Sequence, residues 1–319
     1  MPIITRTALA AVAAILALAG PLAAPAGADP SAAEIEKRLK AASAELEVVV
    51  EQYNALRLDV TRSRTEADTL RSRLAPLESA AAARGDEVGT LAAAAYRTGR
   101  AANAIGLLDA GSPGELGGRL AMLEVLGRQR AEAVAALAAA RRDVAVAQES
   151  LAVVTAREKA QGAQLLTKKR EIEREIDRLN TVRAGLSLDD VVPARVPPPS
   201  SLPPGAASEA VRFAYAQLGK PYRWGAAGPD GYDCSGLTSA AWRAAGVALP
   251  HNARAQYGAV ARIGRDQLRP GDLVFYYSDI HHVGLYVGDG RIIHAPQHGE
   301  RIRFDRFDFQ PIHGYGRPG

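Results

Sequence analysis

Apolar residues recur at two different spacings along the chain, and the change between them divides it. From about Ser31 to Arg183 the apolar positions lie three and four residues apart, within a run of Ala, Leu, Glu, Arg and Lys that has almost no aromatic residues. That spacing and that composition are typical of long helices. From about Ala206 to Gly319 a helical pattern gives way to alternating strand-like segments. The sequence therefore predicts a long α-helical region followed by a smaller α+β domain.

The helical region carries a heptad seam, formed by Leu39, Ala42, Leu46, Val49, Tyr53, Leu56 and Val60. We expect Pro76 to interrupt this helix and Gly111-Ser112-Pro113-Gly114 to break the pattern outright. A second helical stretch runs from about Leu120 to Val182, and two such arms can fold back as an antiparallel hairpin. A spacer or an oligomerisation rod would show the same periodicity. Whether the helices pair within one chain or between chains stays open.

The first residues differ in composition from the helical region. An apolar run from Ala8 to Leu18 follows Arg6 and leads to the small-residue site Ala26-Gly27-Ala28. This pattern predicts a secretory signal peptide over residues 1–28 and a protein located outside the cytoplasmic membrane, in the cell envelope. An uncleaved signal-anchor is the alternative. The expected order is then a coiled-coil hairpin region over 29–191, a Pro-rich linker over 192–205 and a domain over 206–319.

The last domain begins with helices and ends with strands. Glu209 to Leu218 has helical apolar spacing, and a second helix is expected from Ser235 to Ala245, with Asp233 as its N-cap. Leu273, Phe275 and Tyr277 predict a strand with these three side chains on one face, and Asp289-Gly290 predicts a hairpin. This order predicts helices packed on an antiparallel sheet.

Cys234 is the only cysteine in 319 residues, and it lies in the first turn of the expected second helix. A lone cysteine is commonly a small buried hydrophobe. At a helix N-terminus, however, free N–H groups and the helix dipole lower a thiol pKa, which favours a nucleophilic thiolate. The neighbouring Asp233 carboxylate opposes that ionisation, so a basic partner is needed. His281, His282 and His294, in the predicted hairpin, can provide one.

Five motifs in the last domain resemble those of the NlpC family of papain-like cell-wall cysteine peptidases. They occur in the family's order: Pro221-Tyr222-Arg223-Trp224-Gly225, Asp233-Cys234-Ser235-Gly236-Leu237, Arg269-Pro270-Gly271-Asp272-Leu273-Val274-Phe275, His282-Val283-Gly284-Leu285-Tyr286-Val287-Gly288 and Ile293-His294-Ala295. The secreted layout, with a coiled coil and a Pro-rich linker, is similar to that of mycobacterial and other actinobacterial peptidoglycan endopeptidases.

The resemblance implies a papain-like fold and a role for each motif residue. Cys234 would be the nucleophile, His282 the general base and then acid, and His294 the residue that orients His282. Tyr222 and the backbone N–H of Cys234 would line the oxyanion site, while Asp233 and Ser235 would help to hold the stem peptide. The bond implied is that between γ-D-glutamate and meso-diaminopimelate, or its equivalent. No cofactor is implied.

The hairpin geometry decides whether His282 and His294 can meet. His281 and His282 point to opposite faces of a strand, and only His282 fits the family position. A strict two-residue turn at Asp289-Gly290 would pair Leu285 with His294 and place His294 on the wrong face. We therefore predict a three-residue loop or a bulge, which pairs Gly284 with His294.

Other chemistries have little support in the sequence. There is no HExxH motif and no cysteine pair, and His251, His298 and His313 have no recognisable ligand spacing, so we expect no metal and assign those three to surface or structural positions. The net charge of +4 is compatible with an anionic cell envelope, and no nucleic-acid-binding motif accompanies it.

Two classes of function follow. The first is a secreted peptidoglycan endopeptidase whose helical region controls or localises cutting. A related hypothesis is that the helical arms or the linker cover the cleft until a partner moves them. The second is a non-catalytic envelope adaptor that activates another hydrolase. The segment from Tyr96 to Leu126 resembles the hinge region of coiled-coil hydrolase regulators, which implies an FtsEX-like membrane complex as a partner.

Overall fold

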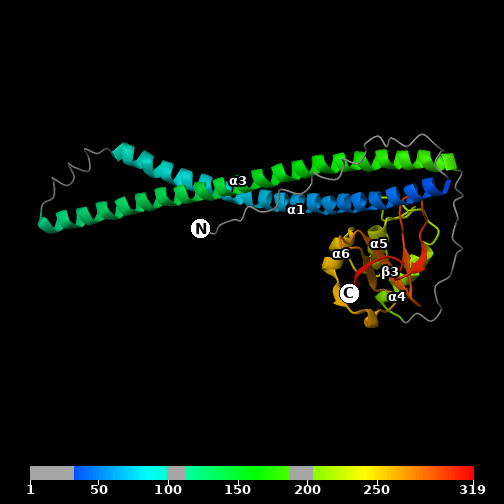
Figure 1. Cartoon of the computed structure of the whole chain (residues 1–319). Helices are drawn as coiled ribbons and strands as arrows, with labels where there is room; N and C mark the ends of the chain where they lie inside the picture. Colours follow the sequence, from blue (N-terminus) through cyan, green and yellow to red (C-terminus); the bar gives the residue numbers. More distant parts are fainter. Residues whose placement is uncertain (1–31, 99–111, 187–203) are drawn as a thin grey trace.

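The computed structural model describes residues 32–98, 112–186 and 204–319. It consists of two long helices, followed by a domain in which helices pack on an antiparallel sheet (Figure 1). The predicted fold class is therefore confirmed. The predicted signal peptide over 1–28 lies outside the described residues, as does the linker up to residue 203. The proposed division into domains stays a prediction.

The two long helices are α1 (Ala32–Thr98) and α3 (Pro113–Leu186), which lie side by side along much of their length (Figure 1). At about 1.5 Å per residue, the 74 residues of α3 span roughly 110 Å. Ser63 donates to Gln161 (2.8 Å) and Gln148 donates to Glu78 (3.2 Å). As the residue number in α1 rises from 63 to 78, that of its partner in α3 falls from 161 to 148, so the helices are antiparallel.

Two expectations about helix ends were wrong. α1 continues through Pro76, and α3 begins at Pro113 instead of near Leu120. Pro76 lies on an exposed part of α1, where water can satisfy the carbonyl that loses its partner. Proline is favoured at the first position of a helix, and the Ser112 hydroxyl accepts the N–H of Glu115 (3.3 Å) as a cap.

The C-terminal domain has three helices, a six-stranded sheet and the short 3-10 helix η1 (Arg265–Gln267). The helices are α4 (Ala206–Ala216), α5 (Cys234–Ala244) and α6 (Ala253–Ala259). The strands are β1 (Ala261–Ile263), β2 (Leu273–Tyr276), β3 (His282–Gly288), β4 (Arg291–His294), β5 (Arg303–Arg306) and β6 (Ile312–Arg317). The sheet order is β1-β6-β2-β3-β4-β5, with every neighbouring pair antiparallel.

Both faces of the central strand β2 are covered. Leu273 and Phe275 point into the core shared with α4 and α5, while Val274 and Tyr276 join a second apolar cluster on the other face. Tyr277 does not follow the predicted alternation, because it lies just beyond β2 with φ 64° and packs with the second cluster. Every member of the larger core belongs to this domain, so the domain has a hydrophobic core of its own.

The hairpin between β3 and β4 contains the predicted bulge. Asp289 (φ 53°) and Gly290 (φ 68°) form a two-residue turn with both φ angles positive. Gly288 pairs with Arg291, but the register then shifts, so that Tyr286 pairs with Ile292 and Val287 is the extra residue. The shift moves Gly284 opposite His294, which is the register that brings the two imidazoles to one face.

The domain is docked against the hairpin near the N-terminal part of α1 (Figure 1). Tyr53 of α1 makes an edge-to-face contact with Trp224, with ring centroids 5.2 Å apart. Arg57 donates to the carbonyl of Gly225 (3.1 Å), and His298 contacts the Asn180 amide oxygen of α3 (3.0 Å). Within the described ranges, every helix is too polar or too short to span a lipid bilayer.

Candidate active site

Cys234 is the first residue of α5, as the sequence predicted. The Asp233 carboxylate caps the helix by accepting the N–H of Gly236 (2.6 Å). A Cβ on Gly236 would lie 2.1 Å from the carbonyl oxygen of Ala226, so only glycine fits this close approach. The loop that contains Ala226 therefore packs directly against the first turn of α5, which carries Cys234.

The two histidines come from neighbouring strands and meet beside Cys234. His282, at the start of β3, places Nε2 2.8 Å from Nδ1 of His294, at the end of β4. The Sγ atom of Cys234 lies within 4.8 Å of a ring nitrogen of His282. All three side chains are buried. His281 points elsewhere, where its ring stacks on Tyr277 and contacts Asp279.

The three predicted substrate-binding residues surround the same cysteine. Tyr222 is buried, and its hydroxyl has no hydrogen-bond partner among the described residues. Asp233 contacts Nε2 of His251 (2.7 Å) and accepts from Asn54 of α1 (3.0 Å). Ser235 donates its hydroxyl to a glutamate of α1, so the structure gathers every predicted site residue at one place.

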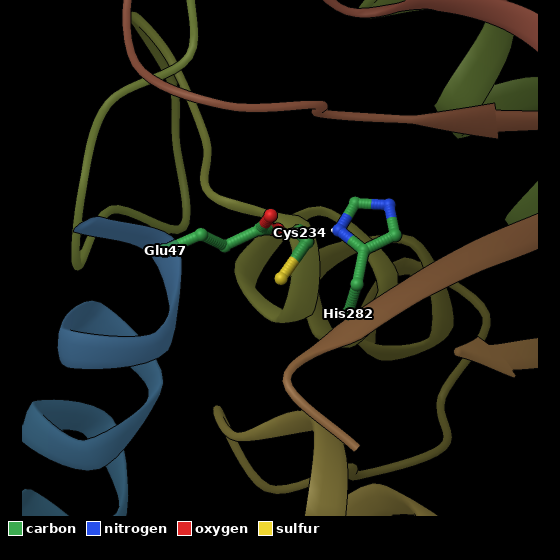
Figure 2. A group of neighbouring side chains, drawn as sticks. All are labelled: Glu47, Cys234 and His282. Atoms are coloured by element: carbon green, nitrogen blue, oxygen red, sulfur yellow. Dashed lines mark hydrogen bonds and ion pairs between the residues drawn. The ribbon is translucent and has the colours of Figure 1, made fainter. Parts of the chain in front are cut away.

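Two glutamates of α1 enter this cleft. The carboxylate of Glu47 hydrogen-bonds Nδ1 of His282, and Figure 2 shows it pointing between His282 and Cys234. Glu51 accepts from Ser235 (2.5 Å), from the Asn252 side chain (2.7 Å) and from the backbone N–H of Ala253 (2.7 Å). Both carboxylates are buried. The cleft of the C-terminal domain is therefore filled by side chains from the N-terminal helix.

Comparison with known proteins gives the family of this chain. The NlpC/P60 family profile matches residues 219–313. A probable endopeptidase of Mycobacterium tuberculosis is 29% identical, over 94% of this chain and 93% of its own. A probable endopeptidase of Corynebacterium glutamicum is 34% identical, over 44% of this chain and 68% of its own. This chain belongs to the NlpC/P60 family. Like its endopeptidase relatives, it is a cysteine peptidase.

A solved NlpC/P60 structure is also similar. The NlpC/p60 domain of the peptidoglycan hydrolase SagA is 32% identical, with a TM-score of 0.33, over 34% of this chain and 97% of its own.

The thiol of this NlpC/P60 peptidase is not in its reactive form in the closed structure. Burial raises the pKa of Cys234 well above its ordinary value, and the negative charges of Glu51, Glu47 and Asp233 raise it further. The expectation of a lowered thiol pKa is therefore wrong for this state, because burial and the three neighbouring carboxylates outweigh the helix N-terminus. The closed arrangement keeps the sulfur protonated.

Glu51 is held in an unfavourable place for a carboxylate. Burial, followed by the charge of Asp233, raises its pKa from 4.5 to about 7, although its hydrogen bonds partly offset the effect. For His251, burial acts to lower the pKa, but the ion pair with Asp233 outweighs it and raises the pKa above the usual value. Docking of α1 therefore places in the site a carboxyl group, Glu51, that holds its proton up to a higher pH than usual.

Glu47, Cys234 and His282 are also the kinds of group that bind zinc. One ligand atom from each lies within 4.8 Å of the others. In this closed state the Glu47 carboxylate and Nδ1 of His282 are already satisfied by their own hydrogen bond. The arrangement is thus accounted for by hydrogen bonding between α1 and the peptidase.

Four residues at this site were not predicted from the sequence: Glu47, Glu51, Asn54 and Asn252. His251, which was expected at a surface or structural position, contacts Asp233. On α1, buried Ser43, Glu47, Glu51 and Asn54 lie four, four and three residues apart, so they form a polar stripe at helical spacing. A polar stripe on a helix ordinarily faces water, so the sequence carries no signal that this one is buried. His251 and Asn252 directly precede α6, where Asn252 caps that helix.

Proposed function

We propose that this chain is a secreted peptidoglycan endopeptidase that cuts stem peptides between γ-D-glutamate and meso-diaminopimelate, and that α1 holds it inactive. The substrate class is supported by the five NlpC-type motifs. The observation that carries the regulation is the hydrogen bond between Glu47 and Nδ1 of His282. That nitrogen is the one free to serve as a base, since Nε2 is engaged by His294.

The proposed reaction begins once α1 has withdrawn. His282 Nδ1 takes the thiol proton, and Cys234 Sγ attacks the scissile carbonyl to form a tetrahedral intermediate. The backbone N–H of Cys234 and the Tyr222 hydroxyl are the donors proposed for the oxyanion. His282 then gives the proton to the leaving amine, the C–N bond breaks, and water hydrolyses the thioester with His282 again as base. His294 holds the ring of His282 throughout.

The docked helix opposes each of these steps. Glu47 is hydrogen-bonded to Nδ1 of His282, the atom that must accept the proton of Cys234. Glu51 accepts the hydroxyl proton of Ser235, so this hydroxyl is not available to a substrate. A substrate cannot reach the sulfur, which is only 1% exposed. The block is therefore both steric and electrostatic.

Export and a membrane partner complete the proposal. The predicted signal peptide supports secretion to the cell envelope. The segment from Tyr96 to Leu126 supports release of α1 by an FtsEX-like complex that binds the far end of the hairpin. Residues 99–111 of that segment lie outside the described residues. Among its described residues, Leu120 and Met122 are large exposed apolar side chains that a partner could cover.

The alternative is a non-catalytic envelope adaptor. The closed cleft would suit such a protein if α1 never withdrew. An adaptor, however, has no chemical need for the complete set of Cys234, His282 and His294.

Muropeptide digestion separates these possibilities. The assay compares the mature chain, residues 206–319, and residues 206–319 carrying Cys234→Ala. We expect the isolated domain to release diaminopimelate-bearing fragments, the alanine variant to release none, and the full chain to be slower. A folded isolated domain that is inert on several peptidoglycan types would support the adaptor. Equal rates for the domain and the full chain would reject the inhibitory role of α1.

A further inference from the structure

The hydrogen-bonded chain that starts at His282 does not end at His294. Nε2 of His294 lies 2.9 Å from Oδ2 of Asp305, on the neighbouring strand β5. The order is therefore His282 Nε2, His294 Nδ1, His294 Nε2 and Asp305 Oδ2. None of the motifs that carry the family resemblance includes Asp305.

The direction of the protons in this chain follows from its last member. An ionised carboxylate has no proton to donate, so His294 must donate from Nε2 to Asp305. A neutral His294 then has only a lone pair on Nδ1, and His282 must donate from Nε2 to that lone pair. His282 is left with its lone pair on Nδ1, which is the tautomer that a base for Cys234 requires.

The surroundings of Asp305 favour this arrangement. Burial opposes ionisation of Asp305, but the hydrogen bond from His294 and the charge of Arg303 outweigh it and keep the pKa of the carboxyl below its usual value. Arg303 Nε contacts the same Oδ2 at 2.9 Å. Burial lowers the pKa of His294 to about 4, so this ring is neutral near pH 7. Phe309 packs against the His294 ring, with centroids 4.8 Å apart.

We propose that Asp305 is a positioning residue of the active site, which fixes the tautomer of His294 and, through it, the tautomer of His282. This inference rests on the proposed function, because it assigns His282 as the base. The set of Cys234, His282 and His294 thereby gains Asp305 as a fourth member, and its last three residues lie on β3, β4 and β5. Asp305 itself touches neither the sulfur nor the substrate.

The test is ¹⁵N NMR of the full-length chain labelled at histidine, combined with hydrolysis rates. In the wild type we expect His294 to carry its single ring proton on Nε2, and His282 to keep a proton on Nε2 in addition to any proton that Nδ1 shares with Glu47. Asp305→Ala removes the acceptor, so a mixture of tautomers is expected at His294 and His282. The value of kcat should fall on the order of tenfold with little change in KM, a small part of the roughly 10²–10⁴ that a general base contributes.

Asp305→Asn is the second variant. Its amide oxygen can still accept from His294, so the tautomers should be retained and most of the activity recovered. Asp308→Ala is the matched control, because Asp308 is exposed and, among the described residues, forms its ion pair with Arg306 and not with a residue of the active site. We expect that control to match the wild type in both measurements.

The outcomes are distinguishable. If Asp305→Ala leaves both tautomers and kcat unchanged, the positioning role is rejected. If Asp305→Ala does not fold, Asp305→Asn decides: retained tautomers support the role, and altered tautomers with unchanged kcat overturn it. If the wild type cleaves no muropeptide, the proposed function fails, while the ring-nitrogen signals still report whether Asp305 sets the tautomers.

Discussion

At the scale of single residues, the proposed inhibition depends on which atom contacts Nδ1 of His282. With Nε2 bonded to His294, Nδ1 can face either the thiol of Cys234 or the carboxylate of Glu47. Two lone pairs cannot form a hydrogen bond, so one proton lies between Glu47 and the ring. In the closed chain Nδ1 of His282 is therefore engaged by Glu47, next to a protonated thiol.

Glu47→Ala should activate the full-length chain. The change frees Nδ1 of His282 and leaves α1 without one of its buried partners, and breaking a buried charged pair costs about 3–5 kcal/mol. We expect muropeptide hydrolysis to rise at least about tenfold, since about 1.4 kcal/mol corresponds to a factor of ten. Glu36→Ala, an exposed position on the same helix, is the control. An unchanged rate in Glu47→Ala, beside an active isolated domain, would contradict this role.

Glu51 should make the closed state sensitive to pH. Its pKa is about 7 when docked and 4.5 in its ordinary state, so the docked chain retains a proton that the open chain loses. Docking is strongest below pH 4.5 and weakens as the pH rises through 7, by roughly 3 kcal/mol for this group. The other titratable groups near it are Glu47, Tyr222, Asp233, Cys234 and His251.

Small-angle X-ray scattering of the full-length chain from pH 5 to pH 8 measures this opening. The radius of gyration should increase toward pH 8, as the released domain moves away from the hairpin. In Glu51→Gln the increase should be smaller, because the group that gains and loses the proton is gone. A radius that increases toward acid pH in the wild type would show that the linkage has the opposite sign.

At the scale of elements, α1 has two faces with different partners. Leu39, Leu46 and Val50 pack in the cluster shared with α3, while Glu47, Glu51 and Asn54 face the peptidase. Tyr53 lies beside this polar stripe and contacts Trp224 at the rim of the cleft. One helix can therefore remain paired with α3 while it releases the peptidase domain.

Tyr53→Ala should weaken docking without disturbing the peptidase core. An aromatic pair contributes about 0.5–1.5 kcal/mol beyond the area that it buries. We expect a several-fold rise in hydrolysis by the full chain, smaller than that of Glu47→Ala. Tyr96→Ala is the matched control, since Tyr96 lies on the same helix but is 89% exposed. Equal activity in the two alanine variants would show that the contact with Trp224 does not hold α1 in place.

At the scale of the whole molecule, the core of the peptidase domain and the contacts at its active site come from different parts of the chain. The larger core contains only residues of the C-terminal domain, whereas Ser235 and its partner Glu51 are 184 positions apart. The domain can therefore be complete while its cleft is filled by a distant helix. Under the proposed function, this separation would let the inhibition be reversed without unfolding of the peptidase domain.

Alkylation of Cys234 by iodoacetamide reports the closure directly, because the chain has no other cysteine. At pH 7.5 we expect the native full-length chain to react at least about tenfold more slowly than residues 206–319. The denatured full-length chain, in which the thiol is exposed, is the control and should react readily. Similar rates for the native full chain and the isolated domain would mean that α1 does not protect the sulfur in solution.

Local pattern was sufficient for much of this protein. Periodicity predicted the two long helices, and Asp233 predicted the cap of α5, because each depends on residues close together in the chain. The bulge at Val287 also followed from sequence, since only a shifted register brings His282 and His294 to one face. The edge strand β1 and its neighbour β6 were missed, because their pairing joins segments that are far apart in the sequence.

The tertiary structure alone decided the state of the site. Glu47, Glu51 and Asn54 have the spacing of an ordinary solvated helix face, and no local pattern says that they are buried against a cleft. The pKa of Cys234 was likewise undetermined by its helix position, since burial and three carboxylates reverse the effect of the helix N-terminus. Charge interactions depend on distance in space, so the sequence identified the nucleophile and the fold determined whether it can react.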